Sequence, residues 1–167
     1  MDPITVSTHV KLPREEVFEY LADIANHAEF TDHYLVDWRL TREDSYGAGA
    51  GARFRVKAPF NSRFSWADMT LAEVQPPFRI VERGRGGKFN RVKMIGRYEL
   101  VEDLHDSHGC VVNYSWESDA SVPSDRLSEI LGGRTWTRRQ AAKAMRRLRA
   151  ILEDGATAGA KPTVAGG

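Results

Sequence analysis

Apolar and polar residues alternate over the first three quarters of the chain, and this alternation predicts β-strands. Between residues 52 and 58, for example, Phe54 and Val56 alternate with three basic residues, as in a strand that buries one face. Prolines and glycines separate the segments. We predict strands at residues 5–12, 35–41, 52–58, 64–74, 78–83, 92–101 and 110–118. Short connections make the later strands antiparallel neighbours.

Two short helices are predicted directly after the first strand. Pro13 suits the first turn of a helix, and the acidic residues Glu15 and Glu16 favour a helix N-terminus. Apolar residues at helical spacing extend this helix to about Asp23, and we expect a second helix at residues 24–30 after a kink.

A long amphipathic helix is predicted at residues 124–153. Its apolar stripe consists of Ile130, Thr137, Ala141, Ala144, Met145, Leu148 and Leu152. Basic residues occupy the margins and the opposite side, which should face water. An antiparallel sheet of about seven strands twists and curls, and the helix would cover its concave side. The sequence therefore predicts an α+β fold.

Two features interrupt the stripe of this last helix. The Gly132-Gly133 pair lies within it, and Arg134 falls at its centre. If the helix is continuous, Arg134 points at the sheet, where it pairs with Asp68 or Glu82 or binds an anionic group of a ligand. If the glycines break the helix, its two parts are uncoupled and Trp136 can turn inward.

The order of these elements and three short motifs resemble the START-like, helix-grip (SRPBCC) superfamily, which includes polyketide cyclases and lipid-transfer proteins. The motifs are PREEVFEYLAD at residues 13–23, EVQPPFRI at residues 73–80 and GCVV at residues 109–112. With the last helix, the resemblance spans about residues 4–153. It identifies a fold and not a reaction.

The resemblance implies a helix-grip fold with a deep cavity between the curled sheet and the last helix. Superfamily members use this cavity for sterols, lipids, polyketides or other apolar molecules, and some of them are enzymes. We therefore expect a START-like ligand-binding domain at residues 1–153 and a flexible tail, rich in small residues, at residues 154–167.

Strand parity selects the residues that would face such a cavity. The candidates are Trp38, Phe54, Val56, Trp66, Asp68, Ile80, Glu82, Met94, Tyr98, Val112, Tyr114 and Trp116 on the strands, with Leu131 and Arg134 on the helix. The phase of strand 64–74 is ambiguous, because Met69 and Leu71 have the opposite parity. The aromatic residues either fill a core or line a pocket. A buried Asp68 or Glu82 needs a partner, in an ion pair or an acid–base pair.

No metal or cofactor is predicted. The histidines, including His27 and His33, lack metal-ligand spacing and are expected at the surface. The glycine-rich segment 47–51 lacks the G-x-G-x-x-G spacing of a dinucleotide site. The lone Cys110 shows no sequence sign of activation as a nucleophile.

Composition narrows the expected partners and location. A net charge of +1 on 167 residues argues against a general nucleic-acid binder. The single cysteine suits a reducing cytoplasm, and the N-terminus lacks a secretory pattern. No apolar run is long enough for membrane insertion. We expect a cytoplasmic monomer or homodimer whose partner is a small hydrophobic ligand.

Two functions fit the sequence best, and a third, an interaction module that uses the basic face of the last helix, fits it less well. The first is a binding protein for a lipid-like, polyketide-like or aromatic molecule, which accounts for the missing acid–base motif. The second is a polyketide aromatase/cyclase or dehydratase that uses Arg, Tyr and Trp residues of the pocket. Trp66, Tyr98, Tyr114 and Arg134 are the candidates for the second function.

Overall fold

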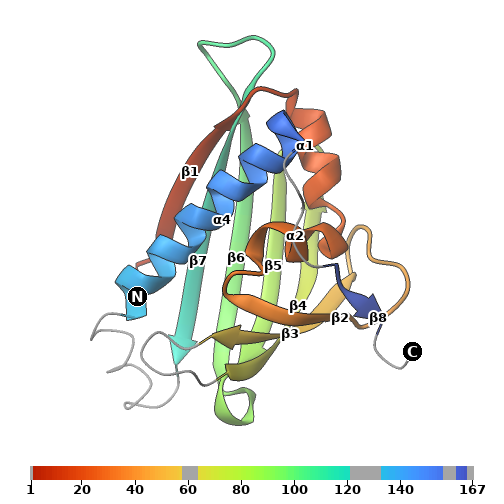
Figure 1. Cartoon of the computed structure of the whole chain (residues 1–167), viewed down its shortest axis with the longest axis vertical. Helices are drawn as coiled ribbons and strands as arrows, with labels where there is room; N and C mark the ends of the chain where they lie inside the picture. Colours follow the sequence, from red (N-terminus) through yellow and green to blue (C-terminus); the bar gives the residue numbers. More distant parts are fainter. Residues whose placement is uncertain (1, 58–63, 121–132, 156–160, 165–167) are drawn as a thin grey trace.

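A computed structural model of the chain describes residues 2–57, 64–120, 133–155 and 161–164. Strands and helices follow one another in an order close to the prediction (Figure 1). They are β1 (Ile4–Val10), α1 (Arg14–Leu21), η1 (Ile24–Asn26), α2 (His27–Thr31), β2 (Leu35–Leu40), β3 (Gly51–Lys57), β4 (Phe64–Gln75), β5 (Arg79–Gly86), η2 (Lys88–Asn90), β6 (Val92–Glu102), β7 (Cys110–Ala120), α4 (Arg134–Asp154) and β8 (Thr163–Val164).

The strands form one curled, open sheet in the order β1-β7-β6-β5-β4-β3-β2-β8. From β2 to β7 each strand pairs antiparallel with the next, as their short connections predict, and β1 closes the row against β7. The α+β, helix-grip fold is therefore confirmed. The eighth strand was not predicted: Thr163 and Val164, within the expected tail, pair in parallel with β2.

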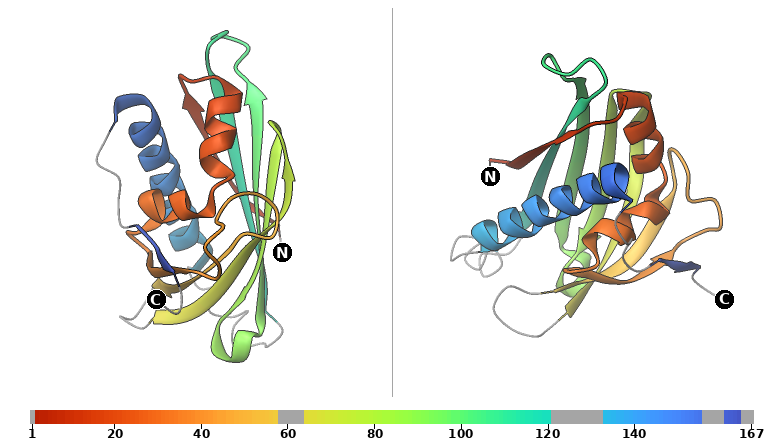
Figure 2. Two further views of the ribbon diagram at one scale, coloured as in Figure 1. Left: turned by 90° about the vertical axis from the view of Figure 1, so that its right-hand side faces the viewer. Right: turned by 45° about the horizontal axis from the view of Figure 1, so that its top comes forward.

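Helices α1, α2 and α4 lie on the concave side of the sheet, where α4 runs obliquely across the strands (Figure 2). Ala141, Ala144, Met145 and Leu148 are the buried residues of α4, and their spacing is that of the predicted stripe. The helix ends where Gly155 adopts a left-handed conformation (φ 60°) and its amide donates to the Ala150 carbonyl.

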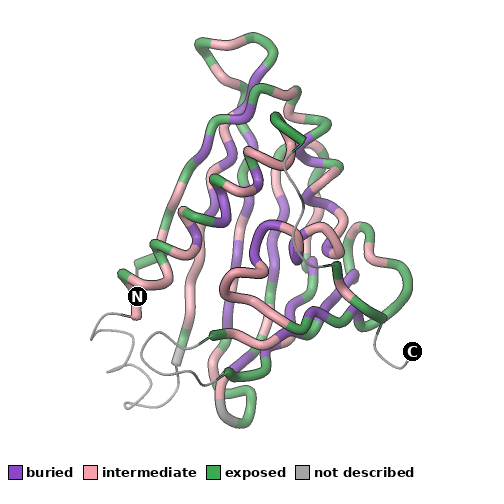
Figure 3. The backbone as a smooth tube through the Cα atoms, in the orientation of Figure 1, coloured by how far each residue is buried: buried purple, intermediate pink, exposed green. Residues whose placement is uncertain are grey.

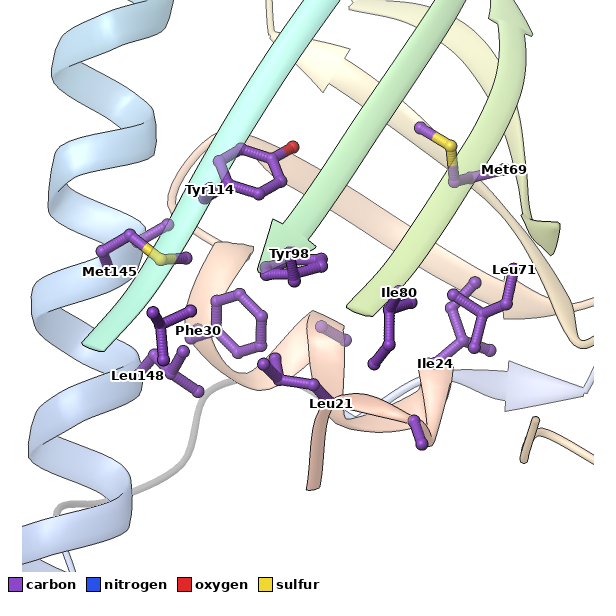
Figure 4. Close-up of a cluster of buried hydrophobic side chains, with 14 of the residues drawn as sticks. Leu21, Ile24, Phe30, Met69, Leu71, Ile80, Tyr98, Tyr114, Met145 and Leu148 are labelled. Carbon is purple, nitrogen blue, oxygen red and sulfur yellow. The ribbon is translucent and has the colours of Figure 1, made fainter. Parts of the chain in front are cut away.

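The hydrophobic core fills the space between the sheet and the helices. Buried positions lie on the facing sides of strands and helices, whereas the turn between β6 and β7 is mostly exposed (Figure 3). Leu21, Ile24 and Phe30 from the short helices pack in one cluster with Ile80 of β5 and Leu148 of α4 (Figure 4). Each large apolar side chain buried in this way contributes about 1.5–3 kcal/mol to stability.

Helix α4 was predicted to begin at residue 124, but residues 121–132 lie outside the described part of the chain. The structure therefore does not test whether Gly132-Gly133 breaks the helix, and Leu131 is not among the described residues. From Arg134 onward the helix is continuous.

One ionic cluster fastens α4 to the α2 region. Arg147 pairs with Asp32, donates to His33 Nδ1 at 3.0 Å and donates to the Glu29 carbonyl at 3.2 Å. Because Arg147 can only donate, His33 Nδ1 is the acceptor and the proton sits on Nε2, which donates to the Gln140 carbonyl at 3.3 Å. Neutral His33 therefore bridges the two helices.

Because of this cluster, we expect the free energy of unfolding to fall in acid. Burial, with the nearby charges of Lys143 and Arg147, lowers the pKa of His33 to about 4. An unfolded histidine has a pKa of about 6.5, so between these values the unfolded chain binds a proton that the fold excludes. The stability advantage of the wild type over His33→Asn, measured by urea unfolding, should shrink as pH falls from 6.5 to 4. Parallel pH profiles would contradict this assignment.

Candidate functional site: an aromatic cavity with a buried acid–histidine pair

A cavity of about 300 Å³ lies between the concave face of the sheet and helices α2 and α4. Side chains from β2 to β7 form one wall, and Ala141, Ala144 and Met145 of α4 form the opposite wall. The volume is about twice that of an apolar cavity known to hold benzene. It is at the lower end of the range for small-molecule sites, so one compact molecule is the appropriate occupant.

Aromatic side chains dominate the cavity walls. Trp38 of β2 packs on Phe54 of β3 with ring centroids 4.5 Å apart. Tyr98 of β6 packs on Tyr114 of β7 at 4.7 Å, and Figure 4 shows Tyr98 among the buried side chains between the sheet and α4. Trp136 of α4 meets Tyr34 edge-on at 6.2 Å. Such walls suit a flat, apolar ligand.

A buried acid–histidine pair forms the polar part of the cavity. His27 Nδ1 of α2 lies 2.8 Å from Glu82 Oε1 of β5, and both side chains are at most 5% exposed. His27 Nε2 lies 2.7 Å from the Leu21 carbonyl. A carbonyl only accepts, so Nε2 must carry a proton. The short contact between Nδ1 and Oε1 then requires a second proton, which the two residues share as imidazolium and carboxylate or as imidazole and carboxylic acid.

The pair also sets the charge state of its surroundings. Burial acts to lower the pKa of His27, but the hydrogen bond to Glu82 and the charge of Glu82 outweigh it and raise this pKa. Burial and the charge of Glu82 raise the pKa values of Tyr98 and Tyr114 well above 10. Both phenols therefore stay protonated and can donate hydrogen bonds.

A glycine on the neighbouring strand makes room for the Glu82 carboxylate. Gly96 of β6 pairs with Glu82 in the sheet register. A Cβ at Gly96 would stand 2.6 Å from Glu82 Oε2 and 3.3 Å from the Tyr114 hydroxyl. The absence of a side chain at this position thus allows a carboxylate and a phenol to gather at one point on the cavity wall.

Three tyrosine side chains of the cavity wall have hydroxyls without a hydrogen-bond partner among the described residues. Within the described part of the chain, Tyr34, Tyr98 and Tyr114 make no side-chain hydrogen bond, although all three line the cavity. Buried hydroxyls usually find a partner in the protein or in water. These groups are therefore available to a bound molecule.

The other end of the cavity is more open and carries ionic side chains. Arg134, at the start of α4, donates from Nη1 to the Asp2 carbonyl at 2.8 Å, and both residues line the cavity. Glu117 also lines this end and pairs with Arg97. Arg134 thus contacts the cavity, but its partner is neither Asp68 nor Glu82, the two acids predicted for it.

The structure brings most of the predicted candidates to the cavity wall. These are Trp38, Phe54, Val56, Glu82, Met94, Tyr98, Tyr114, Trp116 and Arg134. Ile80 and Val112 also point inward, but both are completely buried in the core next to the cavity. Their orientation agrees with the prediction, while binding of a ligand by any of these residues stays a prediction.

The predicted inward orientation of Trp66 and Asp68 was wrong. On β4, Ala67, Met69 and Leu71 are the buried residues, so the strand has the opposite phase. Trp66 is 37% exposed on the outer face, where the guanidinium of Arg53 lies 5.0 Å from its ring. Asp68 pairs there with Arg53 at 3.6 Å. Cation–π contacts and arginine stems allow the outer face to hold a tryptophan.

The most informative residue of the site was missed. His27 was expected at the surface, but it is 2% exposed and is the partner of Glu82. Its signal was present in the sequence: His27 follows the buried Ile24 by three residues and precedes the buried Phe30 by three, which is the spacing of one helix face. The need of Glu82 for a buried partner was predicted, but the partner was not.

Two features that the described residues lack bear on the class of site. Within residues 2–57, 64–120, 133–155 and 161–164, no group of three or more His, Cys, Asp or Glu side chains could hold a metal ion. None of the helices in the same residues is both long and apolar enough to cross a membrane.

Solved structures with the same fold share little sequence with this chain. The TTHA0849 protein of Thermus thermophilus has a TM-score of 0.67 at 9% identity, over 93% of this chain and 100% of that one. Major latex-like protein 151 of Panax ginseng has a TM-score of 0.61 at 11% identity, over 90% and 97%. DynU16, a protein in the dynemicin biosynthetic locus, has a TM-score of 0.60 at 17% identity, over 97% and 49%. These likenesses establish the fold alone.

Sequence comparison supplies the family. No curated protein matches the chain. A family model described as polyketide cyclase/dehydrase and lipid transport matches residues 1–153, a range that contains strands β1 to β7, the short helices and all but the last residue of α4. The chain therefore belongs to the polyketide cyclase/dehydrase and lipid transport family.

Proposed function

We propose that this protein binds one small, predominantly aromatic molecule in the cavity between the sheet and α4. The observation that carries the proposal is the composition of the cavity wall: aromatic and methionine side chains surround a space of about 300 Å³, and a few polar groups converge on it. This combination is the usual form of a small-molecule site. The family of the chain and the cavities of superfamily members support the same function.

The size of the cavity limits the ligand. A molecule of two or three fused rings would fill it, whereas a lipid with two long acyl chains would not fit inside. Apolar surface removed from water contributes about 25 cal/mol per Å² of buried area. The hydrophobic effect therefore supplies most of the affinity, and the polar groups supply orientation.

Native mass spectrometry of freshly purified protein tests this proposal. We expect a complex one small molecule heavier than the bare chain, and the extracted molecule should be apolar and aromatic. Apo protein that binds none of a panel of two- and three-ring aromatic compounds would contradict the proposal. A lipid with two acyl chains in the complex would contradict the size limit.

One observation favours a second function in the same cavity. The shared proton of His27 and Glu82, in a space walled by aromatic side chains, is the kind of acid–base pair that proton-transfer enzymes use. In an aromatase/cyclase or dehydratase, this pair would move protons during ring closure or loss of water. Incubation with a reactive polyketide chain should then shift the distribution of products, and Glu82→Gln should abolish the shift. An unchanged distribution with the wild type would exclude this function.

A further inference from the structure

The buried end of the cavity presents one carboxylate oxygen that has no partner in the described part of the chain. Glu82 Oε1 is occupied by His27 Nδ1 at 2.8 Å. Oε2 lies toward Gly96, and within the described residues it accepts no hydrogen bond. Oε2 is not one of the fully enclosed polar atoms that lack a partner within the described residues, so it opens onto the cavity, and a carboxylate oxygen that faces an apolar space without a donor is costly. The site is therefore complete only when something donates a hydrogen bond to Oε2.

His27 cannot supply that donor. Its Nε2 proton is committed to the Leu21 carbonyl, and Nδ1 faces Oε1. The tyrosines of the cavity wall do not supply it either. Within the described residues, no hydroxyl among Tyr34, Tyr98 and Tyr114 makes a hydrogen bond. The Tyr114 hydroxyl lies beside the same glycine as Oε2: a Cβ built at Gly96 would stand 2.6 Å from Oε2 and 3.3 Å from the Tyr114 hydroxyl. A ligand group that reaches Oε2 and the Tyr114 hydroxyl from the cavity would meet an acceptor and a donor together.

The charge of the pair excludes ionic ligand groups at this end. With one shared proton, His27 and Glu82 carry no net charge in either protonation state. A ligand carboxylate would lie against Oε2, and a ligand ammonium would lose its hydration without a net opposite charge to replace it. A neutral hydroxyl group has neither disadvantage, because it can donate to Oε2 and accept from Tyr114 at once.

We propose that the ligand is a neutral aromatic alcohol of the phenol type, whose hydroxyl donates to Glu82 Oε2 and accepts from the Tyr114 hydroxyl. The aromatic part of the ligand lies between the rings of Trp38, Phe54 and Tyr98. This inference rests on the proposed binding function and specifies the chemical group that the site selects. Glu82 and Tyr114 are the residues that contact the ligand hydroxyl, and His27 is a positioning residue that holds the carboxylate.

Three probes with one ring system test the inference: 2-naphthol, its methyl ether 2-methoxynaphthalene, and naphthalene. Only 2-naphthol can donate a hydrogen bond. We expect calorimetric titration of the wild type to show 2-naphthol binding at least about tenfold more tightly than the other two, as for a hydrogen bond to a charged group. Equal affinity for 2-naphthol and its methyl ether would overturn the inference and leave the proposed function standing. No binding by any probe would contradict both.

Variants of Glu82 test whether the preference for 2-naphthol arises at this residue. Glu82→Met removes the acceptor and should abolish the preference for 2-naphthol while naphthalene still binds. Glu82→Gln keeps a hydrogen bond to neutral His27 and offers the ligand a weaker acceptor, so the preference for 2-naphthol should shrink to a few-fold. This variant tests the inference if Glu82→Met does not fold. The matched control is Asp68→Asn on the outer face of the sheet, which should keep the full preference. A full preference in both Glu82 variants would overturn the inference.

Discussion

Replacement of His27 with leucine is expected to lower the free energy of unfolding by about 3–5 kcal/mol, the usual cost of breaking a buried charged pair. The substitution leaves the Glu82 carboxylate and the Leu21 carbonyl without their partner in the core. Urea unfolding measures the change. The matched control is His9→Leu, because His9 pairs with Asp103 at the surface with 63% of its side chain exposed. Such surface pairs contribute about 0–1 kcal/mol.

A second substitution separates the charge from the packing. In the His27→Leu background, Glu82→Leu removes the stranded carboxylate and should recover much of the lost stability, because a hydrophobic replacement of a buried pair is often neutral. Strictly additive losses in the double variant would show that His27 and Glu82 do not interact. A loss below about 1 kcal/mol in the single variant would lead to the same conclusion.

The pair also predicts a dependence on pH. The pKa of folded His27 is raised above the value of about 6.5 for an unfolded histidine. Below pH 6.5 the folded and unfolded chains both hold the proton, and the stabilisation by the pair is fully present. As pH rises above 6.5 toward the folded pKa, this stabilisation declines. The difference in stability between wild type and the His27→Leu/Glu82→Leu double variant, which has neither ionisable group, should therefore decrease with increasing pH, opposite to the trend expected for His33.

Replacement of Ala144 with phenylalanine is expected to weaken ligand binding by at least about 100-fold, or about 2.8 kcal/mol, because the added ring would take up space that the ligand needs. Ala144 lies on the α4 wall between Ala141 and Met145, and a ring at this position would project into the space of the ligand. An oversized side chain in a packed core lowers the free energy of unfolding by about 1–3 kcal/mol. The loss should be smaller here, because the ring can enter the cavity. Titration with 2-naphthol and urea unfolding measure the two effects.

The control for this variant is Ala142→Phe, two residues away on α4 and about 160° around the helix. Ala142 does not line the cavity. It should retain binding within a factor of about two, since most substitutions away from a site change free energies by less than about 0.5 kcal/mol. Equal binding by the Ala144 and Ala142 variants would show that the ligand does not occupy the cavity.

The fold could be predicted because two independent periodicities agree with each other. The alternation in Ala52–Ala58 and the 3.6-residue stripe through Ala141, Ala144 and Leu148 each specify one buried face. A sheet and a helix with one apolar face apiece have few ways to pack. Short connections then determine the antiparallel neighbours.

Which face of a strand is buried could be predicted only where the other face is clearly polar. In β3 the basic residues mark the outer face, and the prediction for Phe54 and Val56 held. In β4 both faces carry apolar residues, and the prediction chose the phase that turns Trp66 inward over the one that turns Met69 inward. In the structure, arginines cover Trp66 on the outer face. Tertiary cation–π contacts of this kind leave no local signal in the sequence.

Irregular backbone and long-range partners also escaped prediction. Simple alternation through Trp38 would place Val36 on the inner face of β2, but a bulge between Val36 and Arg39, with Asp37 at φ 53°, places Leu35 at the cavity instead. The choice of His27 as partner of Glu82 depends on how α2 packs on β5, and a single strand or helix pattern does not contain that information.

The most direct test of the account follows the three methionine methyl groups at the cavity. Met69, Met94 and Met145 line it from β4, β6 and α4, so they report on three separate walls. In protein labelled with ¹³C-methyl methionine, titration with 2-naphthol should shift all three methyl resonances with one common binding constant, and Ala144→Phe should suppress these shifts. Saturable binding of 2-naphthol that leaves the three resonances unchanged would contradict the account, because the ligand would then occupy another part of the protein.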